Sequence, residues 1–367
     1  MEEHTLEMFE VGPCETPRQL GFLIGRRFSG LIQSRLSRDL IHQNQLLPWA
    51  RAPESRPLLE ALCENNRSKF PRYWEELVGT AEGGGVPVLD VVLIVLINFR
   101  KEILPFIPEK ESKSHPPEKA IECSDVLVVG KSMAVAAHNE DANVALVGHT
   151  YIIKGTLSSG LCFISYTYAG ELPSCAFGFN NNGMGFTLNA VPPSKEEIVA
   201  GGIGRNFISR DLLEATSMTD AAGKIRSAEA SVGHSYNLID LKARRIHNIE
   251  TASKTRLSVT EVDEAPFFHA NMYLHLQVKQ VEDENSRSRQ KRAAVLPKNS
   301  KQDFLSLLGD TDDAKYPIYM SGPTLYTLCT ALVDLDEQTL SIMKGNPKKG
   351  AVSHIFSLSS PDLKELC

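Results

Sequence analysis

The sequence has no excess of positive charge. Its 367 residues include 39 lysines and arginines against 45 aspartates and glutamates, which gives a formal net charge of −6. Proteins that bind nucleic acid or an anionic membrane surface through charge carry a basic excess, often gathered in one patch. Neither partner is therefore expected, whereas small or amphiphilic molecules remain open.

Apolar runs long enough to cross a membrane are also missing. The most apolar stretch, 86–99, has about 14 residues and includes Asp90, whereas a spanning helix needs about 20. The first residues, MEEHTLEMFEVG, are acidic and lack the apolar core of a secretory signal. These absences predict a cytoplasmic protein that does not associate with a membrane.

Cysteines at the close, regular spacing of a metal or disulfide motif are absent as well. The seven cysteines are an odd number, and no CxxC pair or Cys/His cluster occurs along the chain. Disulfide frameworks and zinc sites usually show paired or regularly spaced ligands. The sequence therefore predicts neither, and no metal ion is expected.

Two kinds of pattern divide the chain. Residues 16–44, 58–77 and 89–104 carry apolar side chains at helical spacing, so the first third is expected to be helical. The segment 107–120 is rich in Pro, Lys, Glu and Ser, which is typical of an exposed loop. Short strand-like runs follow, then a helical block, more strands, two helices within 285–308 and a closing hairpin. Strands on both sides of a helical block favour a layered α+β fold.

Cys123 stands at the junction between the exposed loop and the first strand-like run, 124–129. A thiol at this place can attack the preceding carbonyl in an N→S acyl shift, after which water hydrolyses the thioester. The α-amine released by this self-cleavage has a pKa of about 7.7–8.0 and can act as general base for the thiol beside it. Position alone favours the alternative, in which Cys123 is a small buried apolar residue.

The rest of the sequence favours a nucleophile instead. The chain carries, in order, the motifs GFLIG (21–25), CSD (123–125), HNED (138–141), YAG (168–170), NNNGMGFTLN (180–189), HAN (269–271) and GNP (345–347). Together they resemble the isopenicillin N acyltransferase (acyl-coenzyme A:6-aminopenicillanate acyltransferase) family of N-terminal nucleophile enzymes, which includes insect carcinine hydrolases. The resemblance extends over nearly the whole chain. It implies a four-layer αββα sandwich formed by 123–367, with a helical N-terminal segment, 1–122, as a candidate propeptide or α chain.

The resemblance also implies roles for single residues. Cys123 matches the nucleophile, and Asp141 matches the acidic residue that orients the free amine. Two asparagines, Asn189 and Asn271, match positions near the oxyanion, where acyl transfer needs a hydrogen-bond donor. Asn139 and Tyr168 are expected to contact the substrate.

Arg289 lies in a basic run, 286–292, that follows three acidic residues. Such a run is typical of a solvated helix face. The resemblance places Arg289 at a position that is often Ser-Arg in relatives, and no catalytic role is expected for it.

The function implied by the resemblance is hydrolysis or transfer at the amide bond of a small N-acyl amine or N-acyl amino acid, through an acyl-cysteine formed after self-cleavage at Glu122–Cys123. One alternative is an N-acyltransferase that uses acyl-coenzyme A as co-substrate; no other cofactor is expected. Another is an unprocessed, non-catalytic binder of small molecules. Many relatives have glycine where this chain has Glu122, which predicts slow cleavage because glycine tolerates a strained backbone. The two fragments are expected to stay associated, and the sequence leaves the oligomeric state open.

Overall fold

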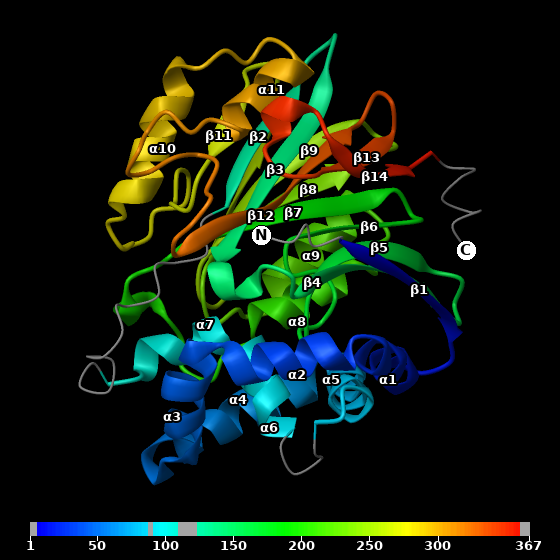
Figure 1. The fold of residues 1–367 in the computed structure, drawn as a ribbon, viewed down its shortest axis with the longest axis vertical. Coiled ribbons are helices and arrows are strands. Elements are labelled where there is room, and N and C mark those ends of the chain that lie inside the picture. The colour runs from blue at the N-terminus through cyan, green and yellow to red at the C-terminus, as the bar shows by residue number, and fades with distance from the viewer. Residues whose placement is uncertain (1–5, 87–90, 109–122, 360–367) are drawn as a thin grey trace.

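The computed structural model of the protein describes residues 6–86, 91–108 and 123–359 (Figure 1). Two β-sheets and two groups of helices make up this part of the chain, so the α+β class expected from the sequence is confirmed. Within the described ranges, no helix is both long and apolar enough to cross a membrane.

The N-terminal segment is mostly helical, as its apolar spacing predicts. Thr16 caps the first helix by accepting a hydrogen bond from the backbone N–H of Gln19, and Pro17 occupies the first turn. The helices of this segment are α1 (Pro17–Arg27), α2 (Ser29–Arg38), α3 (Leu47–Arg51), α4 (Arg56–Lys69), α5 (Pro71–Gly83), α6 (Val91–Asn98) and α7 (Arg100–Ile103).

The expectation of an entirely helical first third is wrong in one respect. Residues Glu7–Cys14 form strand β1, which pairs in parallel with β4 (Thr150–Leu157) at one edge of the larger sheet. This sheet has the order β1-β4-β5-β6-β7-β8-β9-β10. Its remaining strands are β5 (Cys162–Tyr168), β6 (Phe177–Asn180), β7 (Met184–Ala190), β8 (His234–Asp240), β9 (Arg245–Thr251) and β10 (Leu257–Glu261).

The smaller sheet has the order β11-β2-β3-β12-β13-β14 and contains the strand that follows Cys123. The predicted closing hairpin is confirmed as β12 and β13, and the two helices predicted within 285–308 are α10 and α11. The elements concerned are β2 (Ser124–Val129), β3 (Ala134–Asn143), β11 (Phe267–His269), β12 (Leu325–Asp334), β13 (Thr339–Met343), β14 (Val352–Ser357), α10 (Glu284–Val295) and α11 (Lys301–Leu308).

Three apolar cores separate four layers. The first lies between the larger sheet and the N-terminal helices together with α8 (Arg205–Leu212) and α9 (Met218–Ser227). The second fills the space between the two sheets, and the third joins the smaller sheet to α10 and α11. Alternate residues of one strand enter different cores: Val126 contacts the helices and Leu127 faces the other sheet. The four-layer αββα sandwich is therefore confirmed (Figure 1).

Buried ion pairs join the N-terminal segment to the rest of the molecule. Arg35 of α2 donates to the Glu171 carboxylate at 2.6 Å, and Arg210 of α8 lies 3.0 Å from the Glu76 carboxylate of α5. All four side chains are buried. Asn98 adds a hydrogen bond from its amide to the carbonyl of Gly170. These contacts join residues that lie on the two sides of the 122/123 boundary.

Replacing Glu171 with alanine is expected to lower the free energy of unfolding by about 3–5 kcal/mol, because Arg35 would stay buried without its carboxylate. The matched control is Glu60→Ala, since the Arg56–Glu60 pair lies on the surface and its loss should leave stability unchanged. Urea titrations in a Cys123→Ala background, which lacks the thiol expected to cut the chain, provide the measurement. Equal midpoints for the two variants would show that the Arg35–Glu171 pair does not stabilise the fold.

Candidate active site

Cys123 immediately precedes β2, and the antiparallel neighbour β3 brings polar side chains alongside. In the register of this pair, Asp125 lies opposite His138 and Ser124 lies opposite Asn139. Because side chains alternate along a strand, Asp125, His138 and Glu140 enter the space between the two sheets. The apolar residues on the same face of these strands, such as Leu127 and Ala136, belong to the core between the sheets.

A hydrogen-bond network surrounds the thiol. Cys123 Sγ donates to Glu140 Oε2 at 3.3 Å, and His138 Nε2 lies 3.1 Å from the same oxygen. The other ring nitrogen, His138 Nδ1, is 2.9 Å from Asp125 Oδ1. The Tyr168 hydroxyl of β5 donates to Glu140 Oε1. All five side chains are buried, so these contacts form in a low-dielectric environment that strengthens them.

The network continues into the larger sheet. Thr187 of β7 donates its hydroxyl to Asp125 Oδ1 at 2.9 Å, and Asn237 of β8 donates its amide to Thr187 Oγ1 at 2.9 Å. Asn248 of β9 donates in turn to Asn237 Oδ1 at 2.8 Å. Both sheets therefore hold Asp125 and, through it, the orientation of the His138 ring.

The charges of this cluster are set by burial and by close carboxylates. Burial raises the pKa of the Cys123 thiol well above its usual value, and the carboxylates of Glu140 and Asp141 raise it further. Burial alone would lower the pKa of His138, but Asp125 and Glu140 outweigh it and raise the pKa to about 10. At neutral pH the thiol is therefore protonated and His138 is an imidazolium. The group that accepts the thiol hydrogen bond is Glu140.

Asp141 follows Glu140 and differs from it in its hydrogen bonds. Its Oδ1 accepts a hydrogen bond from the Thr327 hydroxyl, whereas Oδ2 has no hydrogen-bond partner among the residues that the structure describes. Burial raises the pKa of Asp141 to about 8. Its backbone N–H faces the thiol of Cys123 and opposes the rise in the thiol pKa. The ionised form of this carboxyl, with one open oxygen, can pair with an ammonium group, whose positive charge would favour that form.

Arg289 contacts the candidate site in a way that the sequence did not reveal. Its Nη1 donates to the carbonyl oxygen of Cys123 and to Ser124 Oγ, each at 2.8 Å. Its Nη2 donates to Asn271 Oδ1 at 2.8 Å. The expectation of a solvated helix face is wrong for this side of α10, where Ser286, Arg289 and Ala293 are all buried. The spacing of three and four residues between them was the available signal.

The two predicted asparagines lie near the ends of two strands. Asn189 is near the end of β7, and Asn271 is in the loop that follows β11. Asn271 donates its amide to the carbonyl of Ala190 at 2.8 Å, so one of its two N–H groups is engaged. Asn189 donates to the carbonyl of His269 at 3.3 Å, and its Oδ1 is unpartnered within the described part of the chain. Asn271 reaches Cys123 through Arg289, which contacts both residues.

The two residues expected to contact substrate have different surroundings. Tyr168 lies in the thiol network through its bond to Glu140. Asn139 enters the opposite face of the smaller sheet, where its amide donates to the carbonyl of Leu308 at 2.8 Å and its oxygen accepts from Thr330. The structure thus brings Tyr168 to Cys123 and turns Asn139 toward α11. Glu122, the predicted cleavage position, lies outside the described residues.

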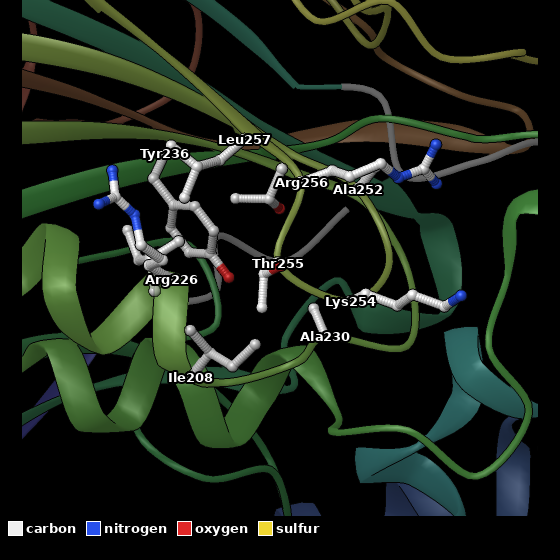
Figure 2. Close-up of a pocket in the computed structure, with 11 residues that line it drawn as sticks. Ile208, Arg226, Ala230, Tyr236, Ala252, Lys254, Thr255, Arg256 and Leu257 are labelled. Carbon is white, nitrogen blue, oxygen red and sulfur yellow. The ribbon is translucent and has the colours of Figure 1, made fainter.

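A small hollow lies elsewhere, against α8 and α9 (Figure 2). Its empty volume, including open solvent, is about 230 Å³, and its lining includes Ile208, Arg226, Tyr236 and Thr255. Tyr236 belongs to the core shared with the helices, on the opposite face of the larger sheet from the thiol network. None of the predicted site residues that the structure describes lines this hollow.

Comparison with known proteins places these observations in context. A family model described as acyl-coenzyme A:6-aminopenicillanic acid acyl-transferase matches residues 128–349, which is more than half of the chain. The matched range includes His138, Glu140, Asp141 and Arg289. No curated protein sequence matches the chain.

Two solved structures are similar to parts of the fold. One is a Caenorhabditis elegans ortholog of N-acylethanolamine-hydrolyzing acid amidase, with 13% identity and a TM-score of 0.38, covering 62% of this chain and 93% of that one. The other is a variant of conjugated bile acid hydrolase from Clostridium perfringens, with 11% identity and a TM-score of 0.39, covering 60% of this chain and 89% of that one.

Proposed function

The chain belongs to the acyl-coenzyme A:6-aminopenicillanic acid acyl-transferase family, and on this premise we propose that Cys123 is the nucleophile in its reaction. The protein is an amide-bond hydrolase or acyltransferase. The proposed substrate is a small N-acyl amine or N-acyl amino acid, whose acyl group passes to the thiol. The observation that carries the proposal is the thiol of Cys123, buried at the start of β2 and hydrogen-bonded to a carboxylate.

The first proposed step is self-cleavage before Cys123. Glu140 accepts the thiol proton, Sγ bonds to the carbonyl carbon of residue 122, and the C–N bond breaks as the proton passes to the leaving nitrogen. This breakage frees the α-amine of Cys123, and water then hydrolyses the thioester, which releases the thiol and a carboxylate at residue 122. The imidazolium of His138 supports this step because it holds Glu140 Oε2 beside the thiol.

In the cut protein the α-amine takes over as general base. It removes the thiol proton while Sγ attacks the amide carbon of the substrate, and it returns a proton to the amine that leaves. Asp141 is proposed to hold this amine through its open Oδ2. Arg289 fixes the backbone of the nucleophile by its hydrogen bond to the Cys123 carbonyl.

The acyl-cysteine is a thioester that either water or an amine can attack. Attack by water gives hydrolysis, and attack by an amine gives transfer. Acyl-coenzyme A is a second proposed acyl donor, because the description of the family names it. A panel of N-acyl amines, each with and without acyl-coenzyme A, tests the function. Failure to cleave any amide or to acylate any amine would contradict the proposal.

Asn271→Ala is expected to lower kcat by about 10²–10³ if its free N–H stabilises the oxyanion. The same change also removes the oxygen that binds Arg289, so a second variant is needed to separate the two roles. Asn271→Asp keeps an oxygen for Arg289 but has no N–H donor, and it should be as slow as the alanine variant. Normal turnover in Asn271→Asp would assign Asn271 to the positioning of Arg289 alone.

A further inference from the structure

The proposed nucleophile and two of its neighbours carry atoms of the kinds that bind metal ions. Cys123 Sγ, one His138 ring nitrogen and one Glu140 carboxylate oxygen all lie within 4.8 Å of one another. Thiolate, imidazole and carboxylate are the three ligand types that zinc binds in proteins. Motif spacing along the chain does not show this group, because its members come from two neighbouring strands.

Two of the three separations between these atoms are close to those of a metal site. Tetrahedral zinc bonds of about 2.0–2.3 Å place neighbouring ligand atoms about 3.3–3.7 Å apart. The distances observed here are 3.3 Å for Cys123 Sγ to Glu140 Oε2 and 3.1 Å for His138 Nε2 to the same oxygen. These two pairs need shifts of only about an ångström or less to reach the tetrahedral spacing. The separation between the sulfur and the ring nitrogen is within 4.8 Å.

The surroundings of the three donors are also suited to a metal. His138 contacts the Asp125 carboxylate through Nδ1, which leaves Nε2 directed toward the group. Glu140 accepts from Tyr168 at its other oxygen, which leaves Oε2 directed the same way. A carboxylate behind the histidine ligand and a donor behind the acidic ligand are the outer contacts that orient metal ligands in proteins.

We propose that Cys123, His138 and Glu140 bind a thiophilic divalent cation of the zinc class, and that the bound cation reversibly inhibits the enzyme. Binding displaces the thiol proton, and any proton carried by Nε2, to solvent, and no atom is oxidised or reduced. The sulfur lone pair then belongs to the metal bond and is withdrawn from attack on the substrate. The inhibition rests on the proposed function, whereas the binding does not.

Self-cleavage would complete the site. Three protein ligands leave one tetrahedral position for water. In the cut protein the α-amine of Cys123 can fill that position, since the amine, Cα, Cβ, sulfur and the metal form a five-membered chelate ring. One ion would then occupy both the nucleophile and its base. The cut form is therefore expected to bind zinc more tightly than the uncut form.

The test starts from full-length protein stripped of metal by a chelator. Titration with Zn²⁺ against a chromophoric chelator should show one tight site per chain. With Co²⁺ as probe, a thiolate-to-cobalt charge-transfer band should appear and should be absent in Cys123→Ser. His138→Gln is expected to weaken Zn²⁺ binding by at least about 100-fold, and Asp125→Asn, one contact farther out, by about 10–100-fold. Cys175→Ser, a buried thiol outside the group, should bind as the parent does.

The outcomes separate the two proposals. Absence of a tight site, or Zn²⁺ binding that His138→Gln and Asp125→Asn leave unchanged in folded protein, would overturn the metal site. Stoichiometric Zn²⁺ binding with undiminished amide hydrolysis would overturn the inhibition. Hydrolysis that persists in Cys123→Ala would instead refute the proposed nucleophile and the inhibition with it, and the binding titration of the parent protein would still decide the metal site.

Discussion

Cys123→Ala is expected to give an uncut chain of 40.5 kDa with no measurable amide hydrolysis. The substitution removes the only thiol that donates to Glu140 among the described residues, so neither the acyl shift nor the acyl-enzyme can form. The parent protein should instead show two fragments beside the precursor. Shares of 122/367 and 245/367 of the mass correspond to roughly 13 and 27 kDa on mean residue mass. Intact-mass measurement over a time course and an amidase assay follow both effects.

The matched control is Cys175→Ala. This thiol is also buried, but it donates to the backbone carbonyl of Tyr166 and lies outside the Cys123 network. The variant should be cut and should turn over substrate as the parent does. If Cys123→Ala still turns over substrate, Cys123 is not the nucleophile. If the parent is active but stays uncut, the free α-amine is dispensable.

Glu140→Gln is expected to slow self-cleavage by about 10²–10⁴, the usual contribution of a general base. An amide keeps the volume of the side chain and an oxygen for the Tyr168 hydroxyl, but it has no carboxylate to accept the thiol proton. The rate of self-cleavage is obtained from the fraction of uncut chain, measured by intact mass over a time course after purification in the cold.

Tyr168→Phe is the control for this position. It removes one hydrogen bond to Glu140 and leaves the carboxylate beside the thiol, so cleavage should slow much less than in Glu140→Gln. Equal rates for the parent and Glu140→Gln would exclude Glu140 as the base. An equal loss of cleavage rate in Glu140→Gln and Tyr168→Phe would mean that the orientation of the Glu140 side chain matters and that its basicity does not.

The fold was predictable where pattern and packing agree. Helical spacing located the N-terminal helices, and the family resemblance supplied the four layers. Strand β1 was not predicted from the sequence, because Glu7 and Glu10 interrupt its apolar pattern and because its partner β4 lies far along the chain. Parallel pairing over such a distance leaves no local signal in the sequence.

The site was predictable in part, for a related reason. The motif His138-Asn139-Glu140-Asp141 reads as one polar unit, but a strand directs alternate side chains to opposite faces. His138 and Glu140 therefore join the thiol, while Asn139 contacts α11. The period of two was visible in the sequence. The register that sets Asp125 opposite His138 was not, because it depends on the turn between β2 and β3.

A cut before Cys123 would change the molecularity of unfolding, because β1, at the edge of the larger sheet, would then belong to a separate fragment. While the chain is continuous, unfolding is a first-order event and its midpoint is independent of protein concentration. After a cut before Cys123, the piece that carries β1 and α1 to α7 becomes a separate molecule, held by strand pairing with β4 and by the buried pair Arg35–Glu171. Unfolding then includes dissociation, so the melting temperature rises with concentration by mass action. If the proposed cleavage occurs, dilution is expected to destabilise the cut protein and to leave the uncut chain unaffected.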